Sequence, residues 1–171
     1  QGWLRHVVGL KYFNVFGPNE YHKGGMRSMV HKAYGQVQRE GVIRLFKSDH
    51  PDYKDGEQMR DFLYVKDAVA MTLYLAFSEH AAGIYNVGSG TANTWLNLAE
   101  SVFYALGRDP EITFVPMPEN LRGTYQYYTR ADIDKIRDAG YTEEITPLRD
   151  AITDYVQNDL EPGKHVGEYP L

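Results

Sequence analysis

The sequence predicts an α/β fold. Segments rich in β-branched and aromatic residues alternate with segments whose apolar residues recur every three or four positions, and glycines and prolines separate them. The first segment, residues 6–16, carries a nearly continuous apolar run, which is typical of a strand that is covered on both faces in a parallel sheet. We therefore expect alternating strands and helices that are joined by right-handed crossovers.

The first half of the chain predicts two strand-to-helix units. The expected elements are strand 6–16, helix 26–40, strand 42–46, strand 60–65 and helix 67–79. Gly41 ends the first helix, and the polar residues 47–59 predict an exposed loop. Asp67 is the expected N-cap of the second helix. The apolar stripe that we expect this helix to bury consists of Val69, Leu73, Ala76 and Phe77.

The second half adds two strands and is helical toward its end. The expected elements are strand 83–90, a helix from Thr94 to Gly107, strand 111–115, a helix with a Thr129–Asp132 capping box that ends at Gly140, and a helix that begins at Thr146-Pro147. Residues 161–171 show no apolar periodicity and predict a loose tail.

Composition limits the class of protein. The chain has 171 residues, of which 43% are hydrophobic and 24% charged, and its formal net charge is -5. No apolar run approaches the roughly 18–20 residues that span a bilayer, and no block of basic residues indicates nucleic acid as a partner. The lack of cysteine excludes a disulfide framework and a Cys nucleophile, and it is compatible with the cytoplasmic location that we expect. The chain begins without Met, so we expect it to be part of a larger protein.

Three strand ends carry asparagines, charged residues or glycines and are therefore candidates for a ligand site. They are Phe13–Pro18, Arg60–Asp67 and Tyr85–Gly90. Ligands of open α/β sheets bind beyond the carboxyl ends of strands. Taken one at a time, these segments are equally explained by asparagines that cap turns and by glycines that permit tight corners.

Taken together, the order and spacing of the three segments resemble the C-terminal half of the extended short-chain dehydrogenase/reductase family, and within it the nucleotide-sugar epimerases and dehydratases. The resemblance implies the last strands of a Rossmann domain, interleaved with a small α/β domain that binds the sugar nucleotide. It assigns residues 1–16 and 60–107 mainly to the Rossmann part, residues 17–59 and 108–160 mainly to the substrate-binding part, and residues 161–171 to the tail.

Two further segments, Glu20–Met26 and Arg122–Asp132, are similar to one branch of this family. That branch inverts the sixth carbon of ADP-glycero-manno-heptose, a precursor of lipopolysaccharide cores, and the resemblance implies the same activity here. Two alternatives stay open: another nucleotide-sugar 4-epimerase or dehydratase of the same family, and a non-catalytic nucleotide-sugar-binding module.

The chemistry of such an inversion explains why a lysine belongs in the site. A carbon that carries H and OH, without an adjacent carbonyl, is inverted by removing hydride to a tightly bound nicotinamide and returning it to the other face. The two poses of the intermediate ketone are best served by two proton-transfer groups on opposite sides. The family's first group is the Tyr of a Tyr-x-x-x-Lys helix, which this chain lacks together with the glycine-rich turn. The resemblance makes Lys23 the second group; without it, Lys23 would be an ordinary loop lysine.

The resemblance also implies binding roles. Val15 and Lys23 would lie against the cofactor, which we expect to be NADP, with NAD as the alternative. The positions expected to contact the ADP-sugar substrate are Asn14, Gly25, Lys32, Phe46, Lys47, Ser48, Arg60 and Tyr125. Arg60 would bind the diphosphate through its bidentate fork, and Tyr125 would hold the sugar end. For the substrate contact expected from helix 26–40, His31 is an alternative to Lys32.

For two of the expected substrate-binding residues, Arg60 and Tyr125, a structural role is the alternative. Arg60 and Asp61 would form a local ion pair, and Tyr125 would be a packing residue. The histidines lack metal-ligand spacing, so we expect no metal site. We expect the full-length protein to be a homo-oligomer, and the chain alone to expose an apolar face where the rest of the sheet would pack.

Overall fold

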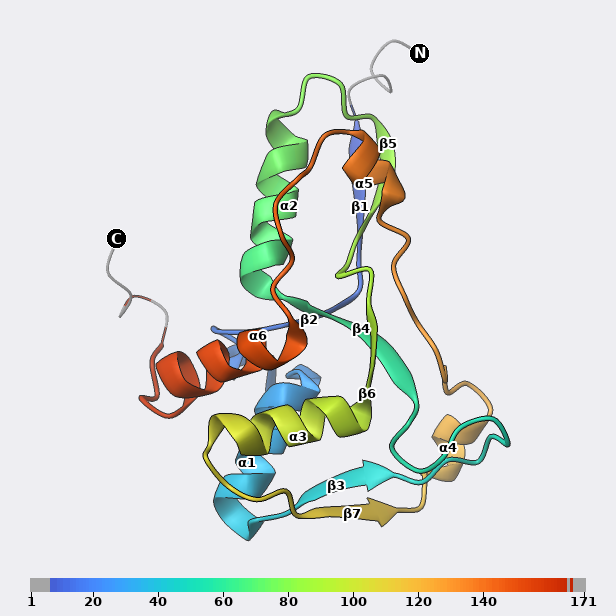
Figure 1. The fold of residues 1–171 in the computed structure, drawn as a ribbon, viewed down its shortest axis with the longest axis vertical. Coiled ribbons are helices and arrows are strands. Elements are labelled where there is room, and N and C mark those ends of the chain that lie inside the picture. Colours follow the sequence, from blue (N-terminus) through green and yellow to red (C-terminus); the bar gives the residue numbers. More distant parts are fainter. Residues whose placement is uncertain (1–6, 166, 168–171) are drawn as a thin grey trace.

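Figure 1 shows the fold in the computed structural model, which describes residues 7–165 and 167. The strands are β1 (Val8–Tyr12), β2 (Asn14–Phe16), β3 (Ile43–Phe46), β4 (Met59–Tyr64), β5 (Gly83–Val87), β6 (Ala92–Thr94) and β7 (Ile112–Val115). The helices are η2 (Tyr21–Met26), α1 (Met29–Glu40), α2 (Val65–Phe77), α3 (Trp95–Ala105), α4 (Glu119–Arg122), α5 (Asp134–Asp138), α6 (Leu148–Tyr155) and η3 (Val156–Leu160). This order confirms the predicted α/β class.

The described strands form three small sheets. β1 pairs in parallel with β5, and β3 pairs in parallel with β7. β4 lies between β2, which is parallel to it, and β6, which is antiparallel. In Figure 1 the β1–β5 pair and α2 occupy one end of the molecule, the β3–β7 pair occupies the other, and β4 runs between them.

The predicted strand 6–16 is in fact two strands that separate at Phe13; His6 lies outside the described residues. β1 follows β5 up to the pair Tyr12–Val87, and the backbone N–H of Phe13 donates a last hydrogen bond of 3.0 Å to the Val87 carbonyl. β2 then pairs with β4 instead. Apart from Asn14, aromatic and apolar residues continue from Tyr12 to Phe16, so the sequence pattern predicted one strand.

The predicted helix 26–40 begins later than expected. α1 starts after Ser28, whose side-chain oxygen accepts a hydrogen bond of 3.2 Å from the backbone N–H of His31. The preceding residues form η2, a separate 3-10 turn that is kinked at Gly24 with φ of 52°. Gly41, with φ of 74°, ends α1 as predicted.

Two predictions about α2 are wrong. The helix begins at Val65, and the Asp67 carboxylate accepts two hydrogen bonds of 3.0 Å from the backbone N–H and the side-chain hydroxyl of Thr146 rather than capping its own helix. The residues of the expected core stripe are exposed: Val69 and Leu73 at 51%, Phe77 at 83%, and Ala76. The buried side instead carries Ala68, Met71 and Leu75. The helix is apolar on both sides, and periodicity alone did not identify the side that packs. The exposed side of α2 is therefore an apolar surface.

The last third contains less helix than predicted. Thr129 is not a cap, because its hydroxyl accepts a hydrogen bond of 3.3 Å from the backbone N–H of Asp61, and only Asp134–Asp138 are helical. Thr146 does not cap α6 because Asp67 engages it. By contrast, the start of the helix at Thr94 is confirmed. Thr94 forms a reciprocal capping box with Asn97 at the start of α3. The tail prediction falls partly outside the described residues.

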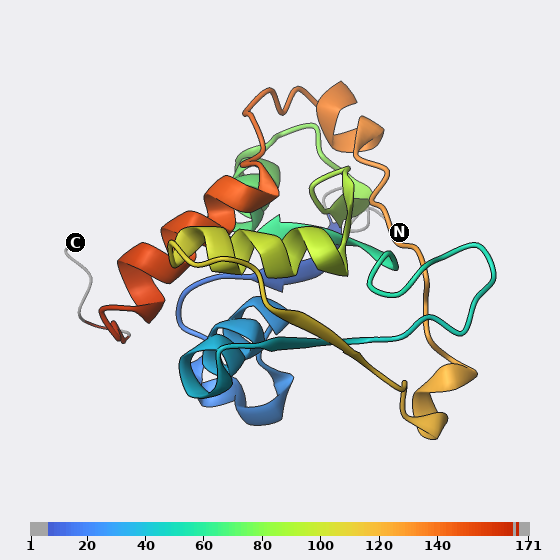
Figure 2. The ribbon, with the colours of Figure 1, turned by 60° about the horizontal axis from the view of Figure 1, so that its bottom comes forward.

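The core has two parts. The larger lies among α1, α3, α6 and the strands β2–β4, and its biggest buried side chains include Phe16, Phe103, Ile152 and Tyr155. Figure 2 shows α3 and α6 side by side across this part. The smaller part packs α2 against β1 and β5 through residues such as Met71 and Tyr85. In the part of the chain that the structure describes, no helix combines the length and apolar character needed to cross a bilayer.

Candidate functional site

Two neighbouring pockets lie where β2, β3 and β7 meet the starts of α1 and α3. Pocket A, with a cavity volume of about 310 Å³, is lined by Met29, Lys32, Gln36, Arg44, Leu45, Phe46, Trp95, Val115 and Tyr125. Pocket B, of about 240 Å³, contains residues of β2 and η2 together with Glu20, Arg27 and the start of α1. Met29 and Trp95 line both pockets, so the two cavities adjoin across these side chains.

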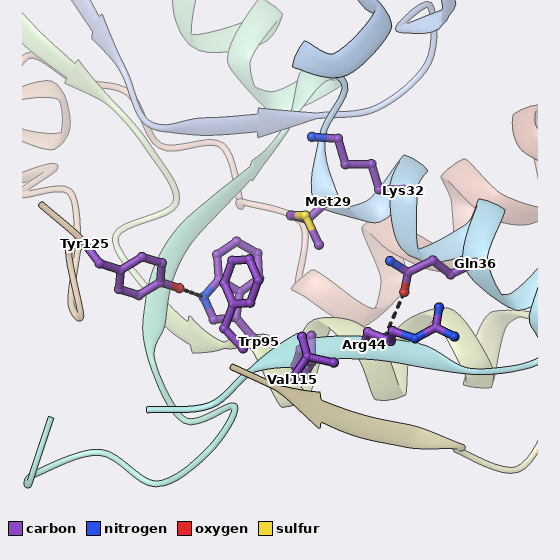
Figure 3. A pocket seen from close by; sticks show the side chains of 9 residues that line it. Met29, Lys32, Gln36, Arg44, Trp95, Val115 and Tyr125 are labelled. Carbon is purple, nitrogen blue, oxygen red and sulfur yellow. Dashed lines mark hydrogen bonds between the residues drawn. The ribbon is translucent and has the colours of Figure 1, made fainter. Parts of the chain in front are cut away.

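The walls of pocket A follow from helix periodicity and strand register. Met29, Lys32 and Gln36 recur at intervals of three and four along α1 and therefore share one face. Phe46 and Val115 are paired at the ends of β3 and β7. In Figure 3, Tyr125 and Trp95 lie at one end of the pocket and Gln36 and Arg44 at the other. The Gln36 side-chain oxygen accepts a hydrogen bond of 2.9 Å from the backbone N–H of Arg44, which fastens α1 to β3.

Arg60 is a buried cation beside pocket A. Its side chain is only 8% exposed, and its guanidinium lies 5.1 Å from the ring centre of Tyr125 and 6.0 Å from that of Trp95. Its one protein hydrogen bond in residues 7–165 and 167 runs to the Met59 carbonyl at 2.8 Å, and no carboxylate there forms an ion pair with it. Burial lowers the pKa of Arg60, because the charged form is less favourable away from water. Arg60 thus has N–H donors that no acceptor in residues 7–165 and 167 uses.

The predicted alternative of an Arg60–Asp61 ion pair is wrong. Adjacent strand residues point to opposite faces, and the fully buried Asp61 carboxylate faces away from Arg60's ring partners. It accepts hydrogen bonds from three backbone N–H groups, those of Ser89 at 2.7 Å and of Gly90 and Ala131 at 2.9 Å. Asp61 therefore ties β4 to the turn after β5 and to the segment that leads from Tyr125 into α5.

Tyr125 is held by its neighbours in pocket A. Its hydroxyl oxygen accepts a hydrogen bond of 2.8 Å from the indole N–H of Trp95 (Figure 3). Its ring meets that of Tyr127 edge-on, with ring centres 5.2 Å apart. Burial raises the pKa of Tyr125, while the Arg60 charge and the Trp95 hydrogen bond act in the opposite direction. The hydroxyl therefore stays protonated at neutral pH and can donate a hydrogen bond.

Pocket B brings together Asn14, Val15 and Lys23. Lys23 lies on η2 and its side chain is exposed, so it reaches the pocket from the rim. Glu20 is buried beneath it, at 2% exposure: its carboxylate accepts a hydrogen bond of 2.9 Å from the backbone N–H of Ser28, and its carbonyl accepts one of 2.9 Å from that of Lys23. Glu20 therefore fixes the turn that presents Lys23.

Lys32, and not His31, faces a pocket. Lys32 lines pocket A, whereas the His31 ring packs edge-on against Tyr21 with ring centres 5.3 Å apart. The Nε2 atom of His31 is buried and has no hydrogen-bond partner among the residues that the structure describes. Burial lowers the pKa of His31, the charge of Arg27 lowers it further, and Glu20 opposes this effect.

Comparisons with known proteins identify relatives of this chain. Residues 4–88 match the NAD dependent epimerase/dehydratase family. An ADP-L-glycero-D-manno-heptose-6-epimerase of Nitratidesulfovibrio vulgaris is 52% identical to this chain over 160 residues, which are 94% of this chain and 50% of that protein. The chain belongs to the NAD dependent epimerase/dehydratase family.

Further proteins and solved structures are similar to this chain. An ADP-L-glycero-D-manno-heptose-6-epimerase of Fusobacterium nucleatum is 45% identical over 158 residues, or 89% of this chain and 48% of the relative. The crystal structure of the Helicobacter pylori ADP-L-glycero-D-manno-heptose-6-epimerase superposes with a TM-score of 0.73 at 30% identity, and the match covers 88% of this chain and 43% of that one. A UDP-N-acetylglucosamine 4-epimerase of Methanobrevibacter ruminantium shares the fold, with a TM-score of 0.71 at 23% identity. The chain spans about half the length of the curated relatives that it matches.

Some of the family positions expected from the sequence lie outside both pockets. Gly25 is exposed, and a Cβ atom at this position would meet no other atom within 4 Å. Lys47 and Ser48 line neither cavity. The Ser48 backbone N–H donates to the Asp55 carboxylate at 2.8 Å, so Ser48 orders the loop that follows β3. Of the expected group Phe46, Lys47 and Ser48, only Phe46 lines pocket A.

Sequence reasoning missed several residues that the structure places in the pockets. Trp95, Gln36 and Glu20 were not among the expected site residues. The spacing of Gln36 four residues after Lys32 was the available signal for its place in pocket A. Nothing in the local sequence indicates that Trp95 meets Tyr125, because thirty residues separate them.

Proposed function

We propose that the protein is an epimerase that inverts the sixth carbon of ADP-glycero-manno-heptose and that this chain supplies its nucleotide-sugar site. Support comes from the relatives named as ADP-heptose epimerases at 52% and 45% identity. The proposal includes NADP as the cofactor, a cytoplasmic location, a role in lipopolysaccharide precursor synthesis and a homo-oligomeric full-length protein, all of which are expectations from the sequence.

The observation that carries the proposal is the buried, unpaired charge of Arg60. Placing a charge away from water is unfavourable unless a partner compensates it, and no carboxylate in the described residues does so. A diphosphate at the Tyr125 end of pocket A would provide the missing negative charge, and its oxygens match the guanidinium fork. Lys32, from the opposite wall, would add a second positive charge.

Pocket A fits the nucleoside of such a ligand. Its walls are mostly apolar, and a few polar groups stand at its ends, as is usual for small-molecule sites. A flat base would lie against Met29, Trp95 and Phe46, and Gln36 would present its side-chain N–H₂ to it because the oxygen is already bonded to Arg44.

Pocket B fits the reacting end. Asn14 would orient the sugar, and Val15 and Lys23 would hold the nicotinamide end of the cofactor, with Lys23 exchanging a proton with the reacting hydroxyl. A bound nicotinamide supplies reversible hydride transfer, which leaves the cofactor unchanged after one turnover. The presence of Asn14 and Lys23 in the lining of pocket B and its contact with pocket A through Trp95 and Met29 are consistent with this division of roles.

Calorimetric titration of the full-length protein with ADP-glucose, UDP-glucose and dTDP-glucose tests the nucleotide, and NMR of ADP-glycero-manno-heptose turnover tests the reaction. We expect ADP-glucose to bind best and the heptose to be inverted at its sixth carbon. Preference for a UDP- or dTDP-sugar would favour a 4-epimerase or dehydratase instead. ADP-sugar binding without turnover would favour a non-catalytic module.

A further inference from the structure

We infer that Trp95 is a positioning residue that fixes the direction in which Tyr125 donates its hydroxyl proton, so that the proton is offered to a nucleotide sugar in pocket A. This inference rests on the proposed function, because it concerns how the site holds that ligand. Neither the expected site residues nor the resemblance to the family assigned a role to Trp95.

The chemistry of the two groups determines the direction of the hydrogen bond. An indole N–H can only donate, so in the 2.8 Å contact the Tyr125 oxygen must accept. One lone pair of the phenol oxygen is therefore occupied, and its own proton must point elsewhere. Among residues 7–165 and 167, no protein acceptor receives that proton. Both side chains line pocket A, so the proton is available to an acceptor on a bound ligand (Figure 3).

The Trp95 indole is held in place well enough to fix the direction of its N–H. Trp95 is the first residue of α3, directly after the Thr94 capping box, and its backbone N–H donates to the carbonyl of the buried Gln58 at 3.1 Å. Its ring meets Phe62 edge-on at 5.0 Å. Backbone and ring are thus both fixed against β4 and the residue before it, and a fixed donor narrows the orientations open to Tyr125.

The surroundings of Tyr125 favour an oxygen acceptor on an anionic ligand. The Arg60 guanidinium lies against the Tyr125 ring, and its positive charge attracts anions to this end of pocket A. Burial keeps the phenol protonated, as described above, so the group remains a donor. A Tyr125 hydroxyl that turned freely would lose rotational freedom on binding, whereas one already directed by Trp95 loses less.

A double-mutant cycle tests this role with ADP-glucose as the probe and the full-length protein as the sample. Trp95→Phe keeps an aromatic ring but removes the N–H, and Tyr125→Phe removes the hydroxyl on which Trp95 is inferred to act. We expect Trp95→Phe to weaken ADP-glucose binding about three- to tenfold, as for one net hydrogen bond. In the Tyr125→Phe background the same change should have almost no effect.

The cycle separates this inference from the proposed function. Equal weakening by Trp95→Phe with and without the Tyr125 hydroxyl, or no weakening in either, would overturn the positioning role while ADP-glucose binding by the unmodified protein still supports the site. Absence of ADP-glucose binding by the unmodified protein would overturn the proposed function itself. If Trp95→Phe fails to fold, replacing Trp95 by benzothienylalanine, which has sulfur in place of the N–H, gives the same comparison.

Discussion

Pockets A and B adjoin, yet they are built in different ways. Pocket A is lined by residues of β3, β7, α1 and α3, and polar groups in it are fixed by hydrogen bonds such as those of Gln36 and Tyr125. Pocket B receives Lys23 from η2, a short kinked turn without buried residues. Under the proposed function, pocket A would be the nucleotide end of the site, and pocket B would be the reacting end, where the lysine is exposed. Each prediction below tests one side of this contrast.

The largest effect is expected at pocket B. Replacing Lys23 with alanine in the full-length protein should reduce epimerisation about 10²–10⁴-fold, because a proton-transfer group is lost. ADP-glucose affinity should stay nearly unchanged, because pocket A is intact. Single-turnover rates and calorimetry measure the two quantities, and Lys54→Ala, on the exposed loop after β3, is the matched control. Near-normal turnover would remove Lys23 from the mechanism.

The next effect belongs to pocket A. Arg60→Ala should weaken ADP-glucose binding by about 2–4 kcal/mol, because a desolvated charge–phosphate contact is lost. Arg60→Lys keeps the charge without the bidentate fork, so its ADP-glucose affinity should lie between those of the unmodified protein and Arg60→Ala. The free energy of unfolding of the ligand-free protein should not decrease with Arg60→Ala beyond the loss of packing, since no protein charge in the described residues pairs with Arg60. Unchanged ADP-glucose affinity would return Arg60 to a structural role.

A smaller effect, on the free energy of unfolding, is expected for Asp61, which supports the segment that contains Tyr125. Asp61→Asn replaces an acceptor of three backbone N–H groups by a side chain with one acceptor oxygen. Denaturant unfolding should show a loss of about 1–3 kcal/mol, from buried donors that are left without partners. The exposed Asp109→Asn is the control and should change stability little. Equal stability of the two variants would mean that Asp61 does not hold the segment around Tyr125.

The smallest effect concerns pH and the turn that supports pocket B. Burial lowers the pKa of His31 below that of the unfolded chain, so the unfolded state binds a proton first as the pH falls below 6.5, the ordinary value. The folded state should therefore lose stability as the pH falls through and below this value. Melting temperatures should fall less over this range in His31→Gln than in the unmodified chain, while His80→Gln, at an exposed position, should behave like the latter. Identical slopes for all three would contradict a buried neutral His31.

Sequence reasoning predicted local structure where one residue type determines the outcome. Gly41 ends α1 because its φ of 74° suits glycine, and Thr94 caps α3 through a local contact with Asn97. It failed where the outcome depends on distant partners. The change from β5 to β4 at Phe13 and the contact of Asp67 with Thr146 both involve residues far apart in the chain.

The same distinction holds for the candidate site. Asn14, Val15 and Lys23 were placed together by their resemblance to a family, and the structure puts them in pocket B. Phe46, Lys32 and Tyr125 line pocket A, but the packing of Arg60 against Tyr125 and Trp95 joins segments that meet only in the fold. The neighbouring residues Lys47 and Ser48 lie outside the cavities, because β3 ends at Phe46 and the chain continues from there as a loop.

The most direct test of the account is a crystal structure of the full-length protein with ADP-glucose bound. We predict that the diphosphate lies within hydrogen-bond distance of the Arg60 guanidinium, with the adenine in pocket A and the glucose toward Lys23. A diphosphate bound elsewhere, with Arg60 still stacked on Tyr125 and Trp95 and touching no anion, would contradict the central claim that its buried charge anchors the nucleotide sugar.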